Sequence, residues 1–333
     1  MARKLAISLD WQGHFDREKA FERVRIADEV GVDSVWIAEA WGRDCFTLLT
    51  QIAERTKRIR LGTGIVNVYS RTPAALAQHF ATLDELSGGR MIAGFGTSGI
   101  NVIEHFHGVK FEPSLTRLRE VVEIFKIIMR HEPLKYSGKL FRLERGFTLR
   151  FAPVRPDIPV HLATLNPKAL QMTAQVGDGW LPVMIPIDKL GGEVAAMHAR
   201  IKEAGRDLGA FEIHAPGGVT VATGAARAKA EMTLAGTTAF YIGRMGVYYA
   251  RQLERFGFVD EVAKVKEAWS VGSAAAAAAV PEAMRRRLGT VGEVAECRER
   301  LAAEAAAGAN IHRVNVIAEN ASEYGKTLEQ LLA

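Results

Sequence analysis

The chain has 333 residues, and 48% of them are hydrophobic, which is enough to build a large buried core. Its net charge is +5, but the densest basic run, Arg285, Arg286 and Arg287, contains no aromatic residue, which favours a solvated helix face or contact with an anionic ligand tail over a nucleic-acid site. With only Cys45 and Cys297, the sequence excludes a disulfide framework and a zinc-type cysteine spacing.

The N-terminal segment has too short an apolar run for a signal peptide, and nowhere do eighteen apolar residues follow one another. We therefore expect a soluble cytoplasmic protein whose partners include neither a membrane nor a nucleic acid.

Short β-branched runs alternate with amphipathic stretches along the chain, which predicts strands alternating with helices. The predicted strands cover residues 5–9, 34–38, 59–65, 91–95, 160–163, 179–183, 212–222 and 313–316. The predicted helices cover residues 16–31, 46–55, 72–88, 115–130, 166–177, 189–204, 225–280, 291–307 and 322–332. Residues 100–113 are expected to form a loop, and residues 136–151 a hairpin or an irregular insertion.

Three predicted helices begin with residues that suit a helix N-terminus. Asp16 precedes the first helix, and Thr72-Pro73 and Asn166-Pro167 begin two later ones. Their side-chain oxygens can accept hydrogen bonds from free backbone N–H groups, and proline needs no such partner at the first helical position. Because eight helix-linked strands imply a parallel sheet, we predict an α/β fold, a single (β/α)8 TIM barrel over residues 1–333 with insertions after the fourth and seventh strands.

Two glycine-rich turns follow neighbouring strands, at the edge where parallel sheets bind ligands. The first is Gly62-Thr63-Gly64, and the second runs from Gly94 to Gly99. The second matches G-x-G-x-x-G, but a dinucleotide site needs a helix that opens at once in the first strand–helix unit, and three such units precede this turn. A loop that lines a barrel mouth is therefore favoured over a phosphate cradle.

Glu39 is a candidate for proton transfer. It follows the second strand among aromatic residues, and apolar surroundings can raise the pKa of a carboxyl group. A salt bridge to Arg43 or a helix-capping role explains the same residue equally well. Asn166 begins a helix directly after the fifth strand, so this helix N-terminus could hold a phosphate, with ordinary capping as the alternative.

Three further residues are candidates for which a structural role is favoured. His105 and His107 lack a third ligand at a familiar spacing, so no metal site is expected. Cys45 has no identifiable base partner, so packing of its thiol is favoured over nucleophilic catalysis.

Several segments carry a resemblance to a known family. They are AEAWGRDCFTLLTQIAERTKRIRLGTG, LGTGIVNVYSRTP, ELSGGR, the strand ending in GFGTSG, and VHLATLNPKALQMTAQVGDGWLP. Together they resemble the luciferase-like (β/α)8 oxidoreductases, and most of all the branch of methylenetetrahydromethanopterin reductase, which uses the deazaflavin coenzyme F420. The resemblance covers residues 5–186 and continues more weakly to the final strand and helix.

The resemblance implies a set of site residues at the barrel mouth. Gly64 and Ile65 would be joined by a non-prolyl cis peptide bond, in a bulge that backs the deazaflavin ring. The residues near the ring or the substrate would be Asn67, Gly96, Thr97 and Ser98. The residues that hold the ribityl-phosphate part would be Ala163, Thr164, Asn166, Gly177, Asp178, Gly179 and Trp180. The segment between the seventh and eighth strands would close over the site, and members of this family commonly form homodimers.

We therefore expect an F420-dependent oxidoreductase that transfers a hydride between the deazaflavin and a C=N, C=C or carbonyl carbon of a small organic substrate. Some relatives have a histidine where this chain has Ala40. Some also have a glutamate in the loop after the fourth strand, where the first acidic residue of this chain is Glu104. Both departures disfavour the sugar-phosphate dehydrogenase branch. Glu39 is then the candidate catalytic acid. The alternatives are an FMN-dependent monooxygenase on the same barrel and a flavin-binding protein without turnover.

Overall fold

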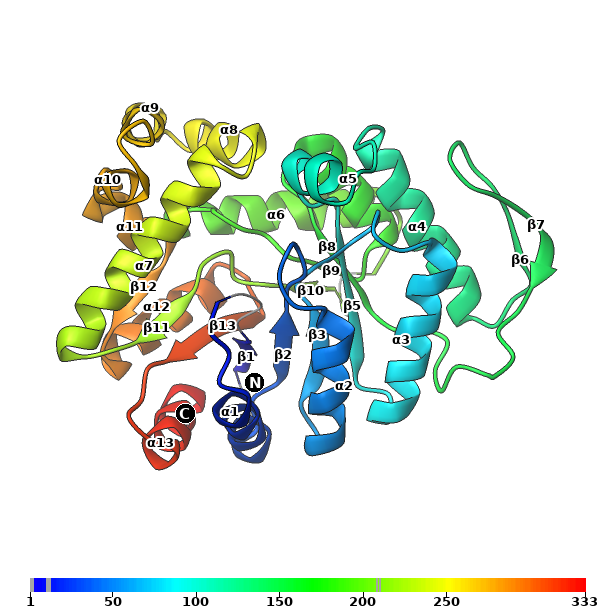
Figure 1. Cartoon of the computed structure of the whole chain (residues 1–333), viewed down its shortest axis with the longest axis horizontal. Helices are drawn as coiled ribbons and strands as arrows, with labels where there is room; N and C mark the ends of the chain where they lie inside the picture. Colours follow the sequence, from blue (N-terminus) through cyan, green and yellow to red (C-terminus); the bar gives the residue numbers. More distant parts are fainter. Residues whose placement is uncertain (1–2, 10–12, 208, 210) are drawn as a thin grey trace.

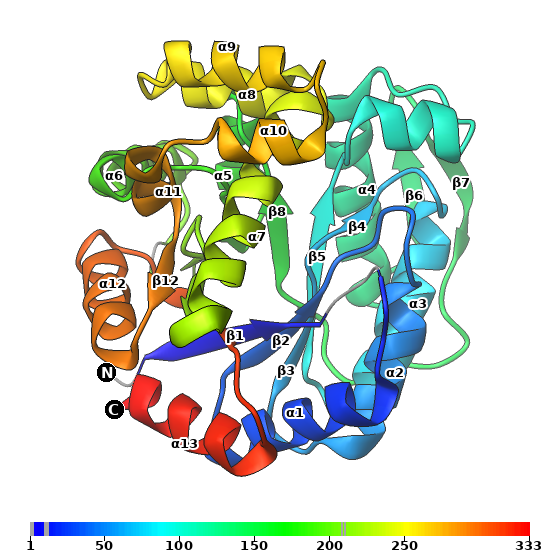
Figure 2. The same cartoon turned by 60° about the vertical axis from the view of Figure 1, so that its left-hand side comes forward.

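The computed structural model describes residues 3–9, 13–207, 209 and 211–333. The chain forms an α/β fold in which a parallel sheet curls, with helices packed along its outer face (Figure 1). Across the described sheet the strand order is β10-β9-β8-β5-β3-β2-β1-β13-β11-β12, and β4 pairs with β5. The first and last helices, α1 and α13, lie side by side below β1 (Figure 2).

The strands of this sheet are short. They are β1 (Lys4–Ser8), β2 (Ser34–Ile37), β3 (Arg60–Thr63), β4 (Val66–Asn67), β5 (Met91–Gly96), β8 (Val160–Ala163), β9 (Gly179–Trp180), β10 (Glu212–Ile213), β11 (Val219–Val221), β12 (Thr290–Gly292) and β13 (Ile311–Val316). A separate antiparallel hairpin, β6 (Leu134–Ser137) and β7 (Arg142–Phe147), projects from the body of the molecule (Figure 1). It overlaps the predicted insertion at 136–151 and begins two residues before it.

The α-helices follow most of the strands. They are α1 (Arg17–Val30), α2 (Cys45–Arg55), α3 (Pro73–Ser87), α4 (Ser114–Met129), α5 (Pro167–Val176), α6 (Ile187–Glu203), α7 (Gly224–Gly243), α8 (Val247–Arg255), α9 (Val259–Ala268), α10 (Ser273–Ala278), α11 (Glu282–Leu288), α12 (Val294–Ala306) and α13 (Ala321–Leu332). No helix of the described residues is long and apolar enough to cross a membrane.

The predicted helix starts are confirmed by their hydrogen bonds. The side chains of Asp16, Thr72 and Asn166 accept from the backbone N–H three residues further on, at the starts of α1, α3 and α5. At the other end of α1, Gly31 adopts φ 92°, a left-handed conformation that glycine enters without steric cost. The buried side chains then form two large clusters. The first extends from β1 to β8 and also takes in β11, β13, α12 and α13, and the second lies around β9 and α6 to α11.

Three expectations about secondary structure need correction. The predicted loop at 100–113 contains a π-helix, η1 (Asn101–Phe106). The predicted strand at 212–222 is divided into β10 and β11, because Pro216 offers no N–H group for a strand pairing. The backbone at Gly217 also passes close to Leu288, so that a Cβ on Gly217 would lie 2.2 Å from the Leu288 carbonyl oxygen. The predicted helix at 291–307 begins only at Val294, because the preceding residues pair with β11 as β12.

Candidate functional site

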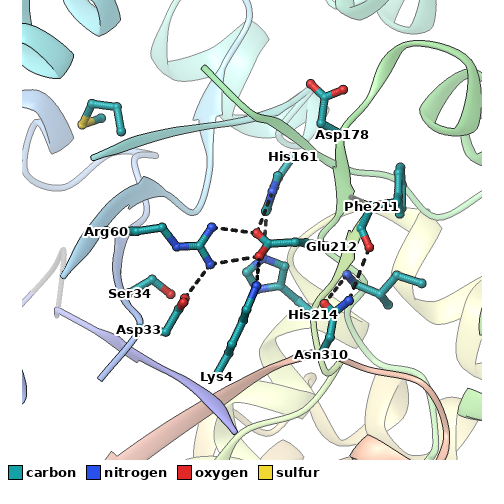
Figure 3. A network of polar contacts seen from close by, with 12 residues as sticks. Lys4, Asp33, Ser34, Arg60, His161, Asp178, Phe211, Glu212, His214 and Asn310 are labelled. Carbon is teal, nitrogen blue, oxygen red and sulfur yellow. Dashed lines mark hydrogen bonds and ion pairs between the residues drawn. The ribbon is translucent and has the colours of Figure 1, made fainter. Parts of the chain in front are cut away.

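An ionic layer lies on the inner face of the sheet, at the amino ends of the strands. Glu212 of β10 meets both Lys4 of β1 and Arg60 of β3 (Figure 3). The ion-pair distances from Glu212 are 2.6 Å to Lys4 and 2.9 Å to Arg60, and Arg60 also pairs with Asp33 at 2.6 Å. Burial raises the pKa of Glu212, but its hydrogen bonds and charge interactions with Arg60 and Lys4 lower it overall. The carboxylate therefore stays ionised and ties three strands together.

An aromatic layer follows towards the carboxyl ends of the strands. His161 Nδ1 and His214 Nε2 are 3.0 Å apart, the Trp36 ring stacks on His161 with centroids 5.6 Å apart, and it meets His214 edge-on at 4.6 Å. The Trp36 indole N–H donates to Ser34 Oγ over 2.9 Å. Burial lowers the pKa of His161 to about 4 and that of His214 well below its ordinary value, so both rings are neutral at pH 7.

Small residues occupy the inner face above the aromatic layer. They are Ser8 of β1, Gly64 after β3, Gly96 of β5 and Ala163 of β8. Ser8 and Gly64 are solvent-exposed, and a Cβ at Gly64 would meet only Trp36, at 3.4 Å. A flat ring can therefore approach the backbone closely at this point, with Trp36 beneath it.

A hollow of about 740 Å³ opens beside these residues, on the side of β1, β13 and β11. Its lining includes Ser8, Tyr241 of α7, and Arg313 and Asn315 of β13. This volume falls in the range of small-molecule sites, roughly 300–1,000 Å³. None of the predicted cofactor-binding residues is among the described residues that line it, so the hollow extends the candidate site beyond the predicted set.

The structure brings together the first part of the predicted site. At the carboxyl ends of adjacent strands, Asn67 lies opposite Gly96, and Gly96 lies opposite Ala163. The same edge carries Gly64, Ile65, Thr97, Ser98, Thr164 and Asn166. The peptide bond between Gly64 and Ile65 is cis, as the resemblance implies. The predicted residues from β3 to the start of α5 therefore lie along one edge of the sheet, where Gly64 is exposed and Asn67, Gly96 and Thr164 are buried.

At this edge of the sheet, the side chain of Asn67 has a hydrogen-bond donor without a partner among the described residues. Its Oδ1 accepts from the N–H groups of Tyr69 and Ser70, at 2.9 and 2.8 Å. Its Nδ2 is buried and makes no hydrogen bond within the described part of the chain. A buried donor without an acceptor carries a desolvation cost, so this amide is suited to an acceptor from a bound molecule.

Gly177, Asp178 and Gly179 are a correction to the predicted site. They lie at the start of β9, at the amino edge of the sheet, and the Asp178 carboxylate accepts from the N–H of Val160, the first residue of β8. Since β8 and β9 are parallel, these residues face the opposite edge from Ala163. Trp180 is buried in the second core, and its indole N–H donates to the Thr164 carbonyl oxygen over 3.0 Å. These contacts are structural, and a cofactor-binding role for the four residues stays a prediction.

Glu39 lies at the carboxyl edge after β2, and both of its carboxylate oxygens are engaged. Arg71 donates to each of them, and the backbone N–H of Cys45 at the start of α2 donates to Oε2 over 3.1 Å. Arg71 also pairs with Asp44. This geometry favours the salt-bridge and helix-capping alternatives, with Arg71 in place of the expected Arg43. Proton transfer by Glu39 stays a prediction.

The other sequence candidates have structural surroundings. No group of three metal-ligating side chains occurs among the described residues, and His105 is exposed. Burial raises the pKa of the Cys45 thiol well above its ordinary value, which makes it unreactive. The basic run on α11 is ion-paired, with Arg286 to Glu282 and Arg287 to Asp188.

The sequence analysis missed the residues that fill the inner face. These are Trp36, His161, His214, Tyr241 and Arg313. The available signal was the period of two along each strand, which places His161 and Arg313 on the face opposite to their apolar neighbours. Which of the two faces points inward depended on the curl of the sheet.

Comparison with known proteins gives a family. The model of the luciferase-like monooxygenase family matches residues 8–310, and the chain belongs to this family. A Mycobacterium tuberculosis protein named "Putative coenzyme F420-dependent oxidoreductase" is 32% identical over 328 residues, 92% of each chain. The 5,10-methylenetetrahydromethanopterin reductase of Archaeoglobus fulgidus is 36% identical over 159 residues, 47% of each chain.

A solved structure supports the same placement of the fold. The coenzyme F420-dependent tetrahydromethanopterin reductase of Methanopyrus kandleri superposes with a TM-score of 0.83 at 23% identity, and the match covers 99% of this chain and 98% of that one. The two proteins share their fold.

Proposed function

We propose that this protein is a coenzyme F420-dependent oxidoreductase, which transfers a hydride between the deazaflavin and a C=N, C=C or carbonyl carbon of a small organic substrate. The observation that carries the proposal is the edge of the sheet at Gly64, Gly96 and Ala163, where adjacent strands end in residues with little or no side chain and Gly64 is open to solvent. The Mycobacterium tuberculosis relative, which is named for coenzyme F420, favours a deazaflavin over FMN as the ring that lies there.

The residues present fit a flat polar heterocycle. Gly64 is exposed and carries no side chain to keep a ring away from the backbone. The buried Nδ2 of Asn67 offers a hydrogen-bond donor, and the carbonyl oxygens of such a ring are acceptors. Both features face the same edge of the sheet, because β3 and β4 are joined by the turn at Gly64-Ile65.

When bound, the deazaflavin supplies the carbon that gives or takes the hydride. The chain would orient the ring and exclude water from it. Gly64 and Ile65 would back the ring, with Asn67, Gly96, Thr97 and Ser98 around it. Ala163, Thr164 and Asn166 would hold the ribityl-phosphate part, because α5 begins there and a helix N-terminus presents free N–H groups and a positive dipole end to an anion.

We also propose that the curled sheet closes as a (β/α)8 barrel. The segment at β10 reaches the start of β13. The Ala215 N–H donates to the Ile311 carbonyl oxygen over 2.8 Å, and the Asn310 N–H donates to the Ile213 carbonyl oxygen over 2.9 Å. These bonds support closure between the seventh and eighth strands. The β6–β7 hairpin and the helices α7 to α11 would then be the two insertions.

Titration of the cofactor-free protein with F420 and, separately, with FMN tests the cofactor. We expect micromolar affinity for F420, followed by fluorescence. In Gly64→Ala the new methyl group would lie on the ring-binding surface, and we expect F420 affinity to fall by about tenfold or more. Gly192→Ala, where the added Cβ meets no atom within 4 Å, is the matched control. Micromolar FMN binding with no response to F420 contradicts the proposal.

Three further parts of the proposal are Glu39 as the proton donor and a cytoplasmic location, both expected from the sequence, and a homodimer, which rests on the resemblance. Glu39 as the proton donor is excluded if Glu39→Gln keeps wild-type turnover across the pH range. The homodimer is tested by the mass of the protein in solution. The cytoplasmic location is tested by fractionation of the cells that make the protein.

A further inference from the structure

Arg313 carries a charge that no described residue neutralises. Its neighbours on β13 point outward: His312 Nδ1 lies 3.1 Å from Glu304 of α12, and Val314 belongs to the core beneath the outer helices. Arg313 therefore points to the inner face, as does Asn315, and both line the hollow. Within the described residues, Arg313 forms neither a hydrogen bond nor an ion pair.

The surroundings of Arg313 leave its charge available to a molecule in the hollow. The side chain is exposed to the solvent in the hollow, and partial desolvation by the surrounding residues lowers its pKa. A guanidinium group remains protonated in proteins, so the charge stays. Glu304, the carboxylate that acts on it from the outer side of β13, already pairs with Arg300 at 3.0 Å. None of the described residues supplies a counterion, so an anion that enters the hollow meets an unpaired guanidinium group.

Tyr241 supplies a second donor to the same hollow. Its ring packs edge-on against Tyr249 of α8, with centroids 4.6 Å apart, which fixes its orientation. Its hydroxyl makes no hydrogen bond with any residue that the structure describes. Burial raises the pKa of Tyr241 and nearby Arg313 opposes this, so the group is a neutral hydroxyl donor at pH 7. The two residues come from β13 and α7, and only the fold brings them together.

We propose that Arg313, assisted by Tyr241, binds a carboxylate of the substrate, so that the enzyme acts on an organic acid. The planar guanidinium fork matches the two oxygens of a carboxylate, and the phenol adds a third donor. Ser8 lines the hollow and also belongs to the layer of small residues with Gly64, which places the anion site beside the proposed ring site. This substrate class rests on the proposed function, because an anion bound in the hollow would be a substrate only if the cofactor ring lies beside it on Gly64.

Calorimetric titration of the cofactor-free protein with sodium benzoate, at constant ionic strength, tests the anion site. We expect saturable binding of benzoate and none of benzamide, its neutral analogue. Arg313→Gln is expected to weaken benzoate binding by about tenfold or more, and Tyr241→Phe by roughly threefold. Arg145→Gln, at an exposed arginine on β7, makes the same chemical change outside the hollow and should bind benzoate as the wild type does.

Four results would overturn the inference. Two concern benzoate itself: no saturable binding to the wild type, or binding that is unchanged in both Arg313→Gln and Tyr241→Phe. The other two are tighter binding of inorganic phosphate than of benzoate, and competition between benzoate and F420. Thermal unfolding shows whether Arg313→Gln is folded, and Tyr241→Phe tests the site with only one oxygen removed.

Titration of the same preparations with F420 separates the two proposals. Intact F420 binding with no benzoate site overturns the inference alone. A benzoate site that depends on Arg313, in a protein that does not bind F420, overturns the proposed function.

Discussion

The backbone N–H of Glu39 donates a 3.0 Å hydrogen bond to the carbonyl oxygen of Ile65, so the segment after β2 holds the turn after β3. The carboxylate of the same residue accepts from Arg71 and from the N–H of Cys45 at the start of α2. One buried glutamate therefore links the proposed ring-binding turn to α2 and to the segment that precedes α3.

Replacement of Arg71 by methionine should strongly destabilise the fold. Arg71→Met leaves the buried Glu39 carboxylate without its cation, and breaking a buried ion pair in this way costs roughly 3–5 kcal/mol. Urea denaturation at pH 7 measures the loss. The control is Arg43→Met, because the Arg43 guanidinium is exposed and hydrogen-bonds only a carbonyl oxygen, so a loss under about 1 kcal/mol is expected. Equal losses in the two variants would contradict the buried ion pair as the cause.

Gly94 should tolerate no side chain. A Cβ there would lie 1.7 Å from the carbonyl oxygen of Thr63, and a backbone atom of a neighbouring strand has little room to move. We expect Gly94→Ala to be insoluble or to lose more than about 4 kcal/mol of unfolding free energy. Gly64→Ala adds the same methyl group at an ordinary contact distance of 3.4 Å and should remain folded. A soluble Gly94→Ala protein with the wild-type unfolding midpoint rules out this close approach.

The cap at Asn166 should separate stability from phosphate binding. Asn166→Asp keeps a side chain that accepts the Ala169 N–H, so stability should be unchanged, but the added negative charge should weaken F420 binding. Affinity for the same deazaflavin without its phosphate tail should not fall. Asn166→Ala removes the cap and should cost about 1 kcal/mol. If Asn166→Asp weakens both ligands equally, the phosphate does not lie at the start of α5.

The paired histidines should make the protein sensitive to acid. The pKa of His161 is about 4 in the folded protein, against about 6.5 in the unfolded chain, so below pH 6.5 the unfolded state binds more protons. Unfolding free energy is therefore full above about pH 6.5 and falls as the pH drops towards 4, by up to about 3 kcal/mol for this one ring.

Urea denaturation between pH 7.5 and 4.5 checks this dependence. His161→Asn should be less stable than the wild type at pH 7.5 because its packing against Trp36 is lost, but its stability should fall less steeply with acid. The control is His105→Asn, at an exposed histidine, which should follow the wild-type curve. Parallel curves for His161→Asn and the wild type would assign the acid sensitivity to other groups.

The sequence by itself determined the order of strands and helices, the capped starts of α1, α3 and α5, and the turn at Gly64-Ile65. These features are encoded locally, by side-chain periodicity, by capping oxygens and by a family pattern carried on contiguous residues. The same local logic misplaced Gly177, Asp178 and Gly179, because a motif next to a strand does not reveal which end of the strand it occupies once the chain is folded.

Only the tertiary structure decided what lies inside the curled sheet. The partners of Glu212 and His161 come from strands far away in the chain, and Tyr241 reaches the hollow beside Arg313 from a distant helix. Period-two alternation shows that the two faces of a strand differ, but it does not show which face is enclosed. The curl of the sheet made that choice. It turned Arg313 towards a solvent-filled hollow beside Tyr241, and so made an arginine in a short strand the anion site proposed for the substrate.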